Sequence, residues 1–144
     1  MHISTAGTSR GVIDPVRESW FVTTKTYADQ TSRTAQGLGK GRYWVHALDT
    51  RMLAAKEGFS PVALEGLQAD NAPWRVFEGS KHHQRPALQQ VGDHVHAGFA
   101  SHYVQYNFSG WVVAWHAGTG EIAARFATQG GHEVCPSPLG LPVS

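Results

Sequence analysis

The sequence predicts an α+β fold with a mostly antiparallel sheet, and two observations lead to that class. Charged residues make up only 16% of the chain while glycine and tryptophan are plentiful, a mixture closer to strands and loops than to a helical bundle. Strand signals and helix signals also follow one another in an uneven order. A strand, a helix, a strand, helical turns, a long loop and then several strands together favour α+β.

The first third of the chain predicts two strands around one short helix. Residues 1–18 contain glycines and a proline among small polar residues, so no long element is expected there. The run "SWFVTT" (19–24) is β-branched and aromatic, which is typical of a strand. Residues 28–36 have a near-helical apolar period and precede several glycines, which indicates a short, solvated helix. "RYWVHAL" (42–48) is apolar on both faces and predicts an interior strand.

Two more helical segments are expected directly after that strand. Asp49 or Thr50 can cap "RMLAAKE" (51–57), and a glycine can close it. Pro61 loses nothing at a first helical position, so "PVALEGLQ" (61–68) is expected to begin a second helix.

The second half of the chain predicts a long surface loop and then several strands. Residues 70–92 are interrupted by prolines and a glycine and leave room for one brief strand at "WRVFE" (74–78). A Gly-Thr-Gly sequence at 118–120 can turn the last two strands into a hairpin. The strand segments expected after the loop are "HVHAGFA" (94–100), "HYVQYNF" (102–108) and the hairpin pair within 110–127.

Length and charge restrict the class of protein. The 144 residues suit one domain, expected over 1–128, followed by a Gly/Pro-rich tail over 129–144. The single cysteine, Cys135, lies in that tail and offers neither a disulfide nor a cysteine metal cluster. The formal charge is +1 with scattered basic residues, which argues against a nucleic-acid partner. No apolar run is long enough to predict a membrane span, and the amino-terminal residues lack the apolar core of a secretory signal.

Histidines within "VGDHVHAGFASHY" (91–103) raise the possibility of a metal site. Residues two apart on a strand point to one face, so His94 and His96 could present two imidazoles together. No carboxylate follows within "AGFASHY", so a third ligand would have to come from another histidine. The candidates for that third ligand are His82, His83, His102 and His116.

Motifs for covalent catalysis or phosphate binding are weak. No Gly-x-Ser-x-Gly elbow occurs in the sequence. The segment "GLGKGR" (37–42) is rich in glycine, but it lacks the Ser/Thr that follows the lysine of a phosphate-binding loop. A flexible connection into the next strand is the preferred interpretation of this segment.

The segment "SWFVTTKTYADQTSRTAQGLGKGRYWVHALDTR" (19–51) resembles the centre of the bacterial ADP-ribosyltransferase toxins of the cholera and pertussis type. In that family an aromatic-Val-Ser-Thr strand leads into a helix, a glycine-containing loop and a "YIY"-like strand. Here Phe21–Thr24 matches the first strand and Tyr43–His46 the second. The segment "NFSGWVVAWHAGTGEIAARFA" (107–127) is similar to the closing hairpin of the family, so the resemblance covers roughly residues 19–127.

This resemblance implies a mono-ADP-ribosyltransferase-like toxin or effector, secreted or injected, that uses NAD as a substrate and transfers ADP-ribose to a target protein. Cleavage of the nicotinamide–ribose bond passes through an oxocarbenium-like state, which a carboxylate stabilises. The family's catalytic acid motif falls on residues 94–96 and places His96 at the position of the acid. Asp93 and Glu78 are the nearest carboxylates and therefore the candidate acids.

For NAD binding, the resemblance implies a second set of residues. The family uses an arginine for the pyrophosphate and a Ser/Thr motif to form the pocket. An aromatic side chain can also serve as a floor for the nicotinamide. The corresponding candidates in this sequence are Arg10 or Arg17 for the phosphates, Thr23 and Thr24 for the pocket motif, and Tyr43 for the aromatic floor.

Two alternatives remain open at this point. The chain can be a member of that family that has lost catalysis and acts by binding a partner protein. It can also be a small β-rich metal protein centred on His94 and His96.

Overall fold

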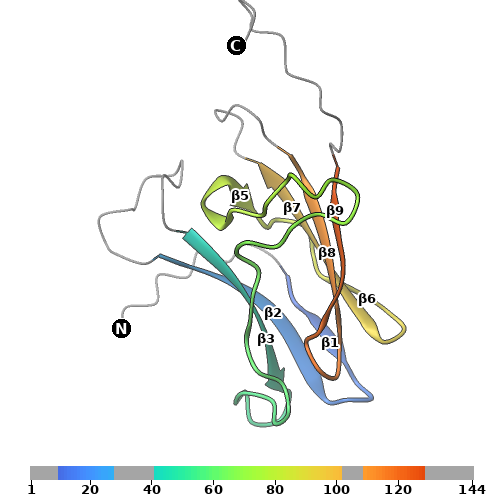
Figure 1. Ribbon diagram of the computed structural model, residues 1–144. Helices are drawn as coiled ribbons and strands as arrows, with labels where there is room; N and C mark the ends of the chain where they lie inside the picture. Colours follow the sequence, from blue (N-terminus) through green and yellow to red (C-terminus); the bar gives the residue numbers. More distant parts are fainter. Residues whose placement is uncertain (1–9, 28–40, 102–108, 129–144) are drawn as a thin grey trace, which may run out of the picture.

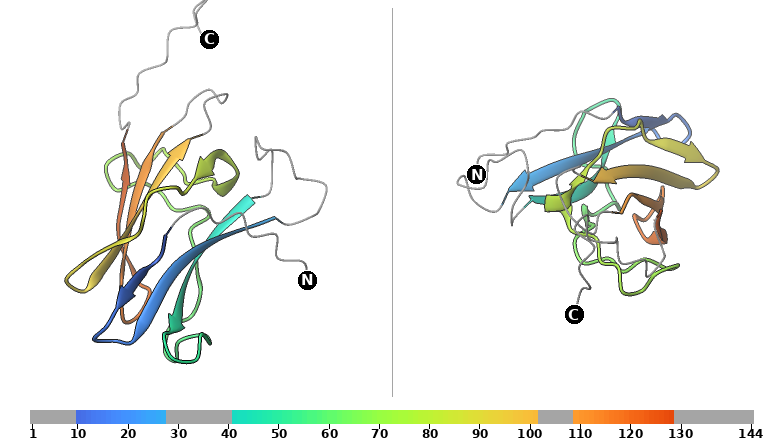
Figure 2. Two further views of the ribbon diagram at one scale, coloured as in Figure 1. Left: turned by 180° about the vertical axis from the view of Figure 1, so that it is seen from behind. Right: turned by 90° about the horizontal axis from the view of Figure 1, so that it is seen from above.

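The computed structural model describes residues 10–27, 41–101 and 109–128, and this part of the chain forms two antiparallel β-sheets. The sheets pack face to face, with the core between them (Figures 1 and 2). The first sheet has the order β1-β2-β3-β4, with strands Val12–Asp14, Ser19–Tyr27, Gly41–Asp49 and Val62–Ala63. The second has the order β5-β7-β8-β9 with β6 also on β7, and its strands are His82–His83, Gln89–Val91, His94–Ser101, Trp111–His116 and Ile122–Ala127.

Alternating burial along β2 and β3 decides which residues line the core. On β2, Phe21, Thr23 and Lys25 are buried, while the residues between them are half-buried. On β3, Tyr43 and Val45 are buried in the same way. Successive side chains of a strand point to opposite faces, so these residues share the inner face of the first sheet.

The core between the sheets is dominated by aromatic side chains from both sheets and from the long connection at 64–88. Phe77, in that connection, is fully buried and meets residues of both sheets. Residues 70–92, expected to be a surface loop, therefore contribute to the core. The largest fully buried side chains are Trp111, Trp115, Phe21, Phe77, Leu64, Val45, Val95 and Val113.

The predicted strands are largely confirmed within the described residues. The β8–β9 hairpin turns at residues 117–120, with Gly120 at φ 78°, as the Gly-Thr-Gly sequence predicts. The strand expected at "WRVFE" is reduced to an isolated bridge between Gln68 and Val76. The expected helix over 28–36, the strand over 102–108 and the tail over 129–144 lie outside the described residues.

The helix predicted at residues 51–57 is wrong, and the reason is local. Asp49 does act as a cap, because its carboxylate accepts the N–H groups of Arg51 (2.9 Å) and Met52 (3.1 Å). One hydrogen-bonded turn follows, closed by the bond from Leu53 N–H to the Asp49 carbonyl at 2.8 Å. Leu53 then adopts a φ of 52°, a left-handed conformation that ends the turn. Ala55 returns to pair with Leu48 as an antiparallel bridge, so the segment is the tip of a hairpin.

The helix predicted at residues 61–68 is also wrong. Val62 and Ala63 form β4 and pair with Val45 and Trp44 of β3. Gly66 then turns the chain with a φ of 82°. The N–H and C=O groups on the side of β3 away from β2 need hydrogen-bond partners, and β4 provides them by pairing there. The only helix in the described residues is the short 3₁₀ turn η1, Gly79–Lys81, so the expected α+β class becomes a mostly antiparallel β class.

Polar side chains cover the outer edge of β9. The carboxylate of Asp70 accepts the N–H of Arg125 at 2.8 Å, and the carbonyl of Arg125 accepts the N–H of Asp70 at 2.7 Å. The side-chain amide of Asn71 exchanges two hydrogen bonds of 2.9 Å with the backbone of Ala127. The edge therefore has its partners within the chain, which limits edge-to-edge association. No helix in the described residues has the length and apolar character needed to cross a bilayer.

The buried carboxylate of Asp14 stabilises the β1–β2 turn through hydrogen bonds. Its carboxylate accepts hydrogen bonds from the N–H groups of Val16 (2.9 Å) and Arg17 (3.0 Å), the Arg17 guanidinium (2.8 Å) and the Gln90 amide (2.8 Å). Burial raises the pKa of this carboxyl, but these hydrogen bonds outweigh burial and lower the pKa to about 2.

Replacing Asp14 with asparagine should cost about 2 kcal/mol at neutral pH, because the Arg17 and Gln90 donors then face an amide N–H₂. The wild-type advantage is present above pH 4 and is lost as the pH falls towards about 2, since the folded-state pKa is the lower one. Urea unfolding at pH 7 and pH 3 measures both effects. Asp93→Asn is the matched control: that carboxylate bonds the same arginine but is 62% exposed, and a loss equal to that of Asp14→Asn would contradict the account.

Candidate functional site

Four polar side chains meet where β2 ends and β3 begins, and we call them the Lys25 cluster: Lys25, Tyr43, Glu65 and His82. Lys25 lies on β2 and Tyr43 on β3, while Glu65 follows β4 and His82 begins β5. The cluster therefore joins the inner face of the first sheet to the edge of the second. It is the place in the described residues where an ammonium, a carboxylate, a phenol and an imidazole come together.

Lys25 is buried, with only 4% of its surface exposed. Its ammonium donates a hydrogen bond to the His82 carbonyl at 3.1 Å and lies 5.4 Å from the ring centre of Tyr43 and 5.6 Å from that of Tyr27. Burial lowers the pKa of Lys25, and the negative charge of Glu65 opposes that shift. The ammonium is therefore held inside the chain, against one carbonyl and two aromatic rings, with the charge of Glu65 nearby.

Glu65 is exposed as a residue, while its carboxylate is turned towards η1. The two carboxylate oxygens lie 2.9 and 3.2 Å from the backbone nitrogen of Gly79, which donates to them. Partial desolvation raises the pKa of Glu65, whereas the Gly79 hydrogen bond and the charges of Arg42 and Lys25 lower it. The result is an accessible carboxylate with two cations nearby.

Two glycines let the backbone approach these charged groups. A Cβ at Gly41 would lie 2.7 Å from Cε of Lys25, and a Cβ at Gly79 would lie 2.9 Å from Oε2 of Glu65 and 2.7 Å from the Gly41 carbonyl oxygen. Any larger residue would have to displace the ammonium or the carboxylate. Gly41, expected to belong to a flexible connection, is therefore part of the packing around Lys25.

The His82 side chain connects the Lys25 cluster with the core through its contact with Phe77. Its ring stacks on Phe77 at 4.7 Å with an interplanar angle of 13°. Nδ1 lies 2.7 Å from the Glu78 carbonyl and Nε2 lies 3.0 Å from the Ser109 carbonyl. Burial lowers the pKa of His82, while the two carbonyls favour its charged form. These contacts hold the His82 backbone, whose carbonyl accepts from both Lys25 and Tyr43.

Tyr43 bridges the two sheets through its hydroxyl, which donates to the His82 carbonyl at 3.2 Å and accepts the Gln84 N–H at 3.1 Å. Its ring, predicted as an aromatic floor for nicotinamide, is buried in the core. Burial raises the pKa of the phenol from 10.0 to about 12.

Tyr43→Phe should lower the free energy of unfolding by about 1–2 kcal/mol at pH 8, because a buried N–H and carbonyl lose their hydroxyl partner. The folded state holds the phenolic proton more tightly, so wild-type stability falls as the pH rises from 10 towards 12, and the variant should lack this component. Urea titrations at pH 8, 10 and 11 test both statements. An identical alkaline decline in the two proteins would refute the second.

The two threonines of the predicted pocket motif point to opposite faces of β2. Thr23 is buried and donates to the side chain of Gln84 at 2.9 Å, next to the Lys25 cluster. Thr24 lies on the outer face, where its hydroxyl is 2.9 Å from Nε2 of His46. Burial lowers the pKa of His46. Only Thr23 can contribute to a site at the cluster.

The predicted acids and arginines do not gather around Thr23. Asp93 pairs with Arg17 at the turn end of the molecule, next to the β1–β2 turn. Glu78, the residue before η1, pairs with Lys81 at 2.7 Å. Arg10 precedes β1, and its carbonyl accepts the N–H of Leu88.

The histidine pair of β7 lies on the outer face of the second sheet. His94 and His96 alternate with buried Val95, as expected of a strand, so their side chains share one face. His94 faces His116 across β7 and β8, with ring centres 5.9 Å apart. Nδ1 of His96 is buried and has no hydrogen-bond partner among the described residues. The His96 side chain therefore lies on the opposite side of its sheet from the buried Val95 and Ala97.

Metal ligation finds no support in the part of the chain that the structure describes. No three His, Cys, Asp or Glu side chains there are placed to hold a metal ion. His102, one of the possible third ligands, lies outside that part.

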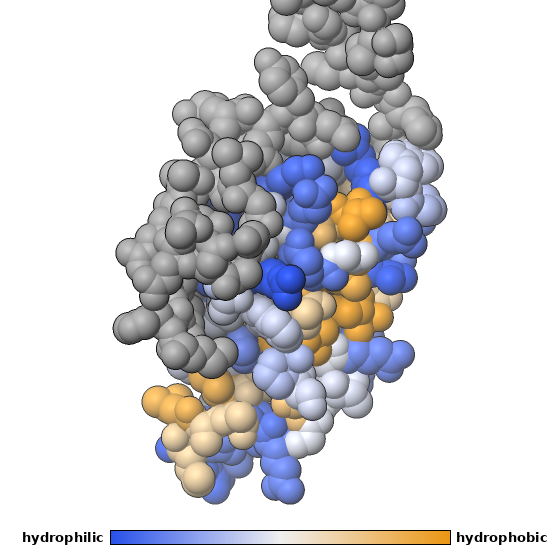
Figure 3. All heavy atoms as spheres, turned by 60° about the vertical axis from the view of Figure 1, so that its left-hand side comes forward, coloured by the Kyte–Doolittle hydropathy of each residue, from blue (hydrophilic) through white to orange (hydrophobic). Residues whose placement is uncertain are grey.

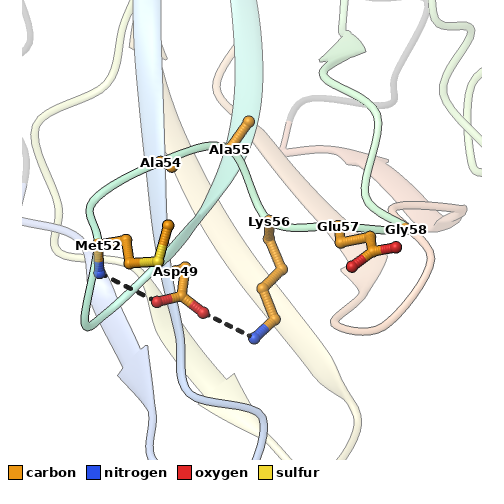
Figure 4. Close-up of a pocket in the computed structure, with 7 residues that line it drawn as sticks. All are labelled: Asp49, Met52, Ala54, Ala55, Lys56, Glu57 and Gly58. Atoms are coloured by element: carbon orange, nitrogen blue, oxygen red, sulfur yellow. Dashed lines mark hydrogen bonds and ion pairs between the residues drawn. The ribbon is translucent and has the colours of Figure 1, made fainter.

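A shallow, open hollow lies on the other end of β3 and is formed by one loop. Figure 4 shows Asp49 at its centre, joined to the backbone of Met52 and to the ammonium of Lys56 at 3.3 Å. Its volume is about 550 Å³, and its two facing charges already satisfy each other. Glu57, an exposed residue, also lines this hollow.

The sequence analysis did not identify Lys25 or Glu65 as site residues, although the sequence does indicate that Lys25 faces inward. Phe21, Thr23 and Lys25 are spaced by two on a predicted strand, so the lysine belongs on the same face as the phenylalanine. Glu65 was assigned to a helix that does not exist, and its position next to η1 depends on a contact between distant parts of the chain.

Comparison with known proteins finds no match: no family model matches the chain, and no curated protein and no solved structure is significantly similar to it. The resemblance to the ADP-ribosyltransferases therefore depends only on the residues quoted for it in the sequence.

Proposed function

We propose that this chain is a divergent ADP-ribosyltransferase-like domain that binds NAD at the Lys25 cluster and transfers ADP-ribose to a target protein. The observation that carries the proposal is the accessible carboxylate of Glu65, which lies beside two cations at the strand that carries Thr23. The sequence resemblance requires a carboxylate next to that strand. Glu65 supplies it, in place of Asp93, Glu78 or His96.

Each group of the cluster has a chemical role under this proposal. The ammonium of Lys25 and the exposed guanidinium of Arg42, whose charge acts on Glu65, are the cations for the pyrophosphate, in place of Arg10 and Arg17. The Glu65 carboxylate stabilises positive charge on the ribose as the bond to nicotinamide breaks. Nicotinamide leaves with the bonding electron pair, the nucleophile of the target attacks the ribose carbon, and its proton passes to Glu65 or to water.

NAD binding provides the first test. Saturating NAD should raise the melting temperature of the full chain, because a ligand that binds only the folded state stabilises it. Lys25→Met keeps the length of the buried side chain and removes its charge, so it should weaken NAD binding about tenfold. Calorimetric titration of both proteins measures the difference. Equal affinity in the two proteins, or no binding by either, would reject this site.

A protein-binding role without chemistry is the second candidate. It is favoured by one observation: the ammonium of Lys25 and the carboxylate of Glu65 already have partners in the chain, so the cluster is stable without a ligand. Absence of both NAD binding and NAD cleavage would leave this candidate as the preferred function.

A further inference from the structure

The two sheets contain similar strand sequences in equivalent places. The sequence "WVHAL" (44–48) of β3 and the sequence "WVVAW" (111–115) of β8 share their tryptophan, first valine and alanine. In both places the chain then turns back to pair with the same strand, through "LAAK" (53–56) and "IAAR" (122–125). Each sheet also follows chain order, from β1 to β4 and from β6 to β9. The sheets are therefore two versions of one four-stranded unit.

Equivalent residues of the two units face in the same direction. Val45 of the first unit is fully buried in the core, whereas its counterpart Val112 is 39% exposed on the outer face of the second sheet. The tryptophans show the reverse arrangement. Trp111 is buried in the core, and its counterpart Trp44 lies half-buried on the outer face of the first sheet. Because alternate residues of a strand point to opposite faces, the two units are stacked front to back.

This stacking leaves one face of each unit without a second sheet. We call the side of Val45 and Val112 the front face of a unit, and the side of Trp44 and Trp111 the back face. The core joins the front face of the first unit to the back face of the second. Among the described residues, no sheet covers the back face of the first unit or the front face of the second (Figures 1 and 2).

The free front face of the second unit is uncharged and built mainly from small residues. Its positions on β7, β8 and β9 are His94, His96, Gly98, Ala100, Val112, Ala114, His116, Ala124 and Phe126. Phe126 exposes 51% of its surface there. A sheet face of this composition without a covering layer is an association surface.

The free back face of the first unit carries larger side chains. Its positions on β1 to β4 include Ile13, Trp20, Val22, Thr24, Trp44, His46, Leu48 and Ala63, with Arg42 at one end. The Thr24 hydroxyl lies 2.9 Å from Nε2 of His46, and the Trp44 indole donates to Thr26 at 3.2 Å, so these polar groups have partners on the same face. Large side chains here and small ones on the free front face suit two layers that interdigitate.

We propose that a second copy of this chain docks its free back face on the free front face of the first copy. The contact repeats, between two molecules, the front-to-back packing that joins the two units inside one molecule. The occupant is a second copy because the chain itself carries the face that corresponds to the one buried in its core. Asp70 and Asn71 already pair with the outer edge of β9, which leaves the faces for association.

A front-to-back contact is heterologous, so each added copy presents a new free face. Sedimentation velocity of the full chain over about a 100-fold range of concentration should therefore show species larger than a dimer at the upper end. A self-complementary contact would stop at the dimer.

Two charged variants test the pairing of the faces directly. Ile13→Glu with Ala63→Glu changes the back face, and Phe126→Glu with Ala124→Glu changes the front face. All four residues are exposed, so the folds and circular dichroism spectra should be unchanged. Each variant alone should stay monomeric. An equal mixture of the two should form a dimer with one copy of each, because each variant supplies the face that the other lacks.

The matched control adds the same charge away from both faces. Figure 3 shows hydrophobic atoms at the lower end of the molecule as well. Val16→Glu with Met52→Glu changes two residues of the turns, 88% and 77% exposed, and should associate as the wild type does. A wild type that is monomeric at every concentration, a face variant that dimerises alone, a mixture that stays monomeric, or loss of association in the control would overturn the proposal.

Discussion

Replacing Phe77 with alanine should destabilise the fold by about 3–5 kcal/mol. Phe77 is fully buried, and its ring contacts aromatic side chains from three elements. Its ring centre lies 6.2 Å from that of Tyr43 on β3, 5.0 Å from Phe99 on β7 and 5.5 Å from Trp111 on β8. His82 stacks on its other side. Neighbours from two sheets cannot collapse into the space together, so a cavity should remain.

Urea unfolding at neutral pH measures this loss directly, with Phe126→Ala as the control. Phe126 is 51% exposed on β9, so its truncation should change stability by no more than about 0.5–1 kcal/mol. A loss below about 1 kcal/mol for Phe77→Ala would mean that the long connection does not close the core. The description of the two sheets as one packed unit would then be wrong.

Glu65→Gln should reduce NAD cleavage about 100-fold or more if the proposed chemistry is right, because the amide cannot supply the negative charge that stabilises the oxocarbenium-like state. It should change stability little, since glutamine can still accept the Gly79 N–H. Cleavage by the wild type should also fall as the pH is lowered through the pKa of Glu65, which lies above its ordinary value of 4.5 because of partial desolvation.

Release of nicotinamide, followed by chromatography, measures this effect. Glu121→Gln is the control because Glu121 is an exposed carboxylate in the β8–β9 turn, away from the cluster. A Glu65→Gln protein with wild-type activity would remove Glu65 from the reaction even if NAD still binds. The same variant with normal binding and no cleavage would support the role given to this carboxylate.

Strand positions could be predicted from the sequence because their signal is local. The β-branched and aromatic run at 19–24 and the apolar run at 42–48 fall within β2 and β3, and the Gly-Thr-Gly sequence gives the last hairpin. The helices at 51–57 and 61–68 were predicted from caps that are also local signals. Their failure depends on non-local pairing: Ala55 returns to Leu48, and Val62 pairs with Val45. Tertiary pairing therefore overrode helix propensity.

The candidate site was less accessible to sequence reasoning than the fold. Strand alternation is enough to place Lys25 beside Thr23 on the inner face. It cannot show that Glu65 and Gly79, 14 residues apart, meet next to that lysine. The spacing of His94 and His96 correctly predicts that both side chains lie on one face of a strand. That face of β7 lies away from the core.

The most direct test of the Lys25 cluster as the ligand site is an amide NMR titration of the full chain with NAD. The proposal predicts saturable shifts of the Gly41, Gly79 and Lys25 amides, which surround the ammonium and the carboxylate. Amides near Asp93 at the opposite end should not move. Shifts confined to that opposite end, or no shifts at millimolar NAD, would contradict the assignment of the site.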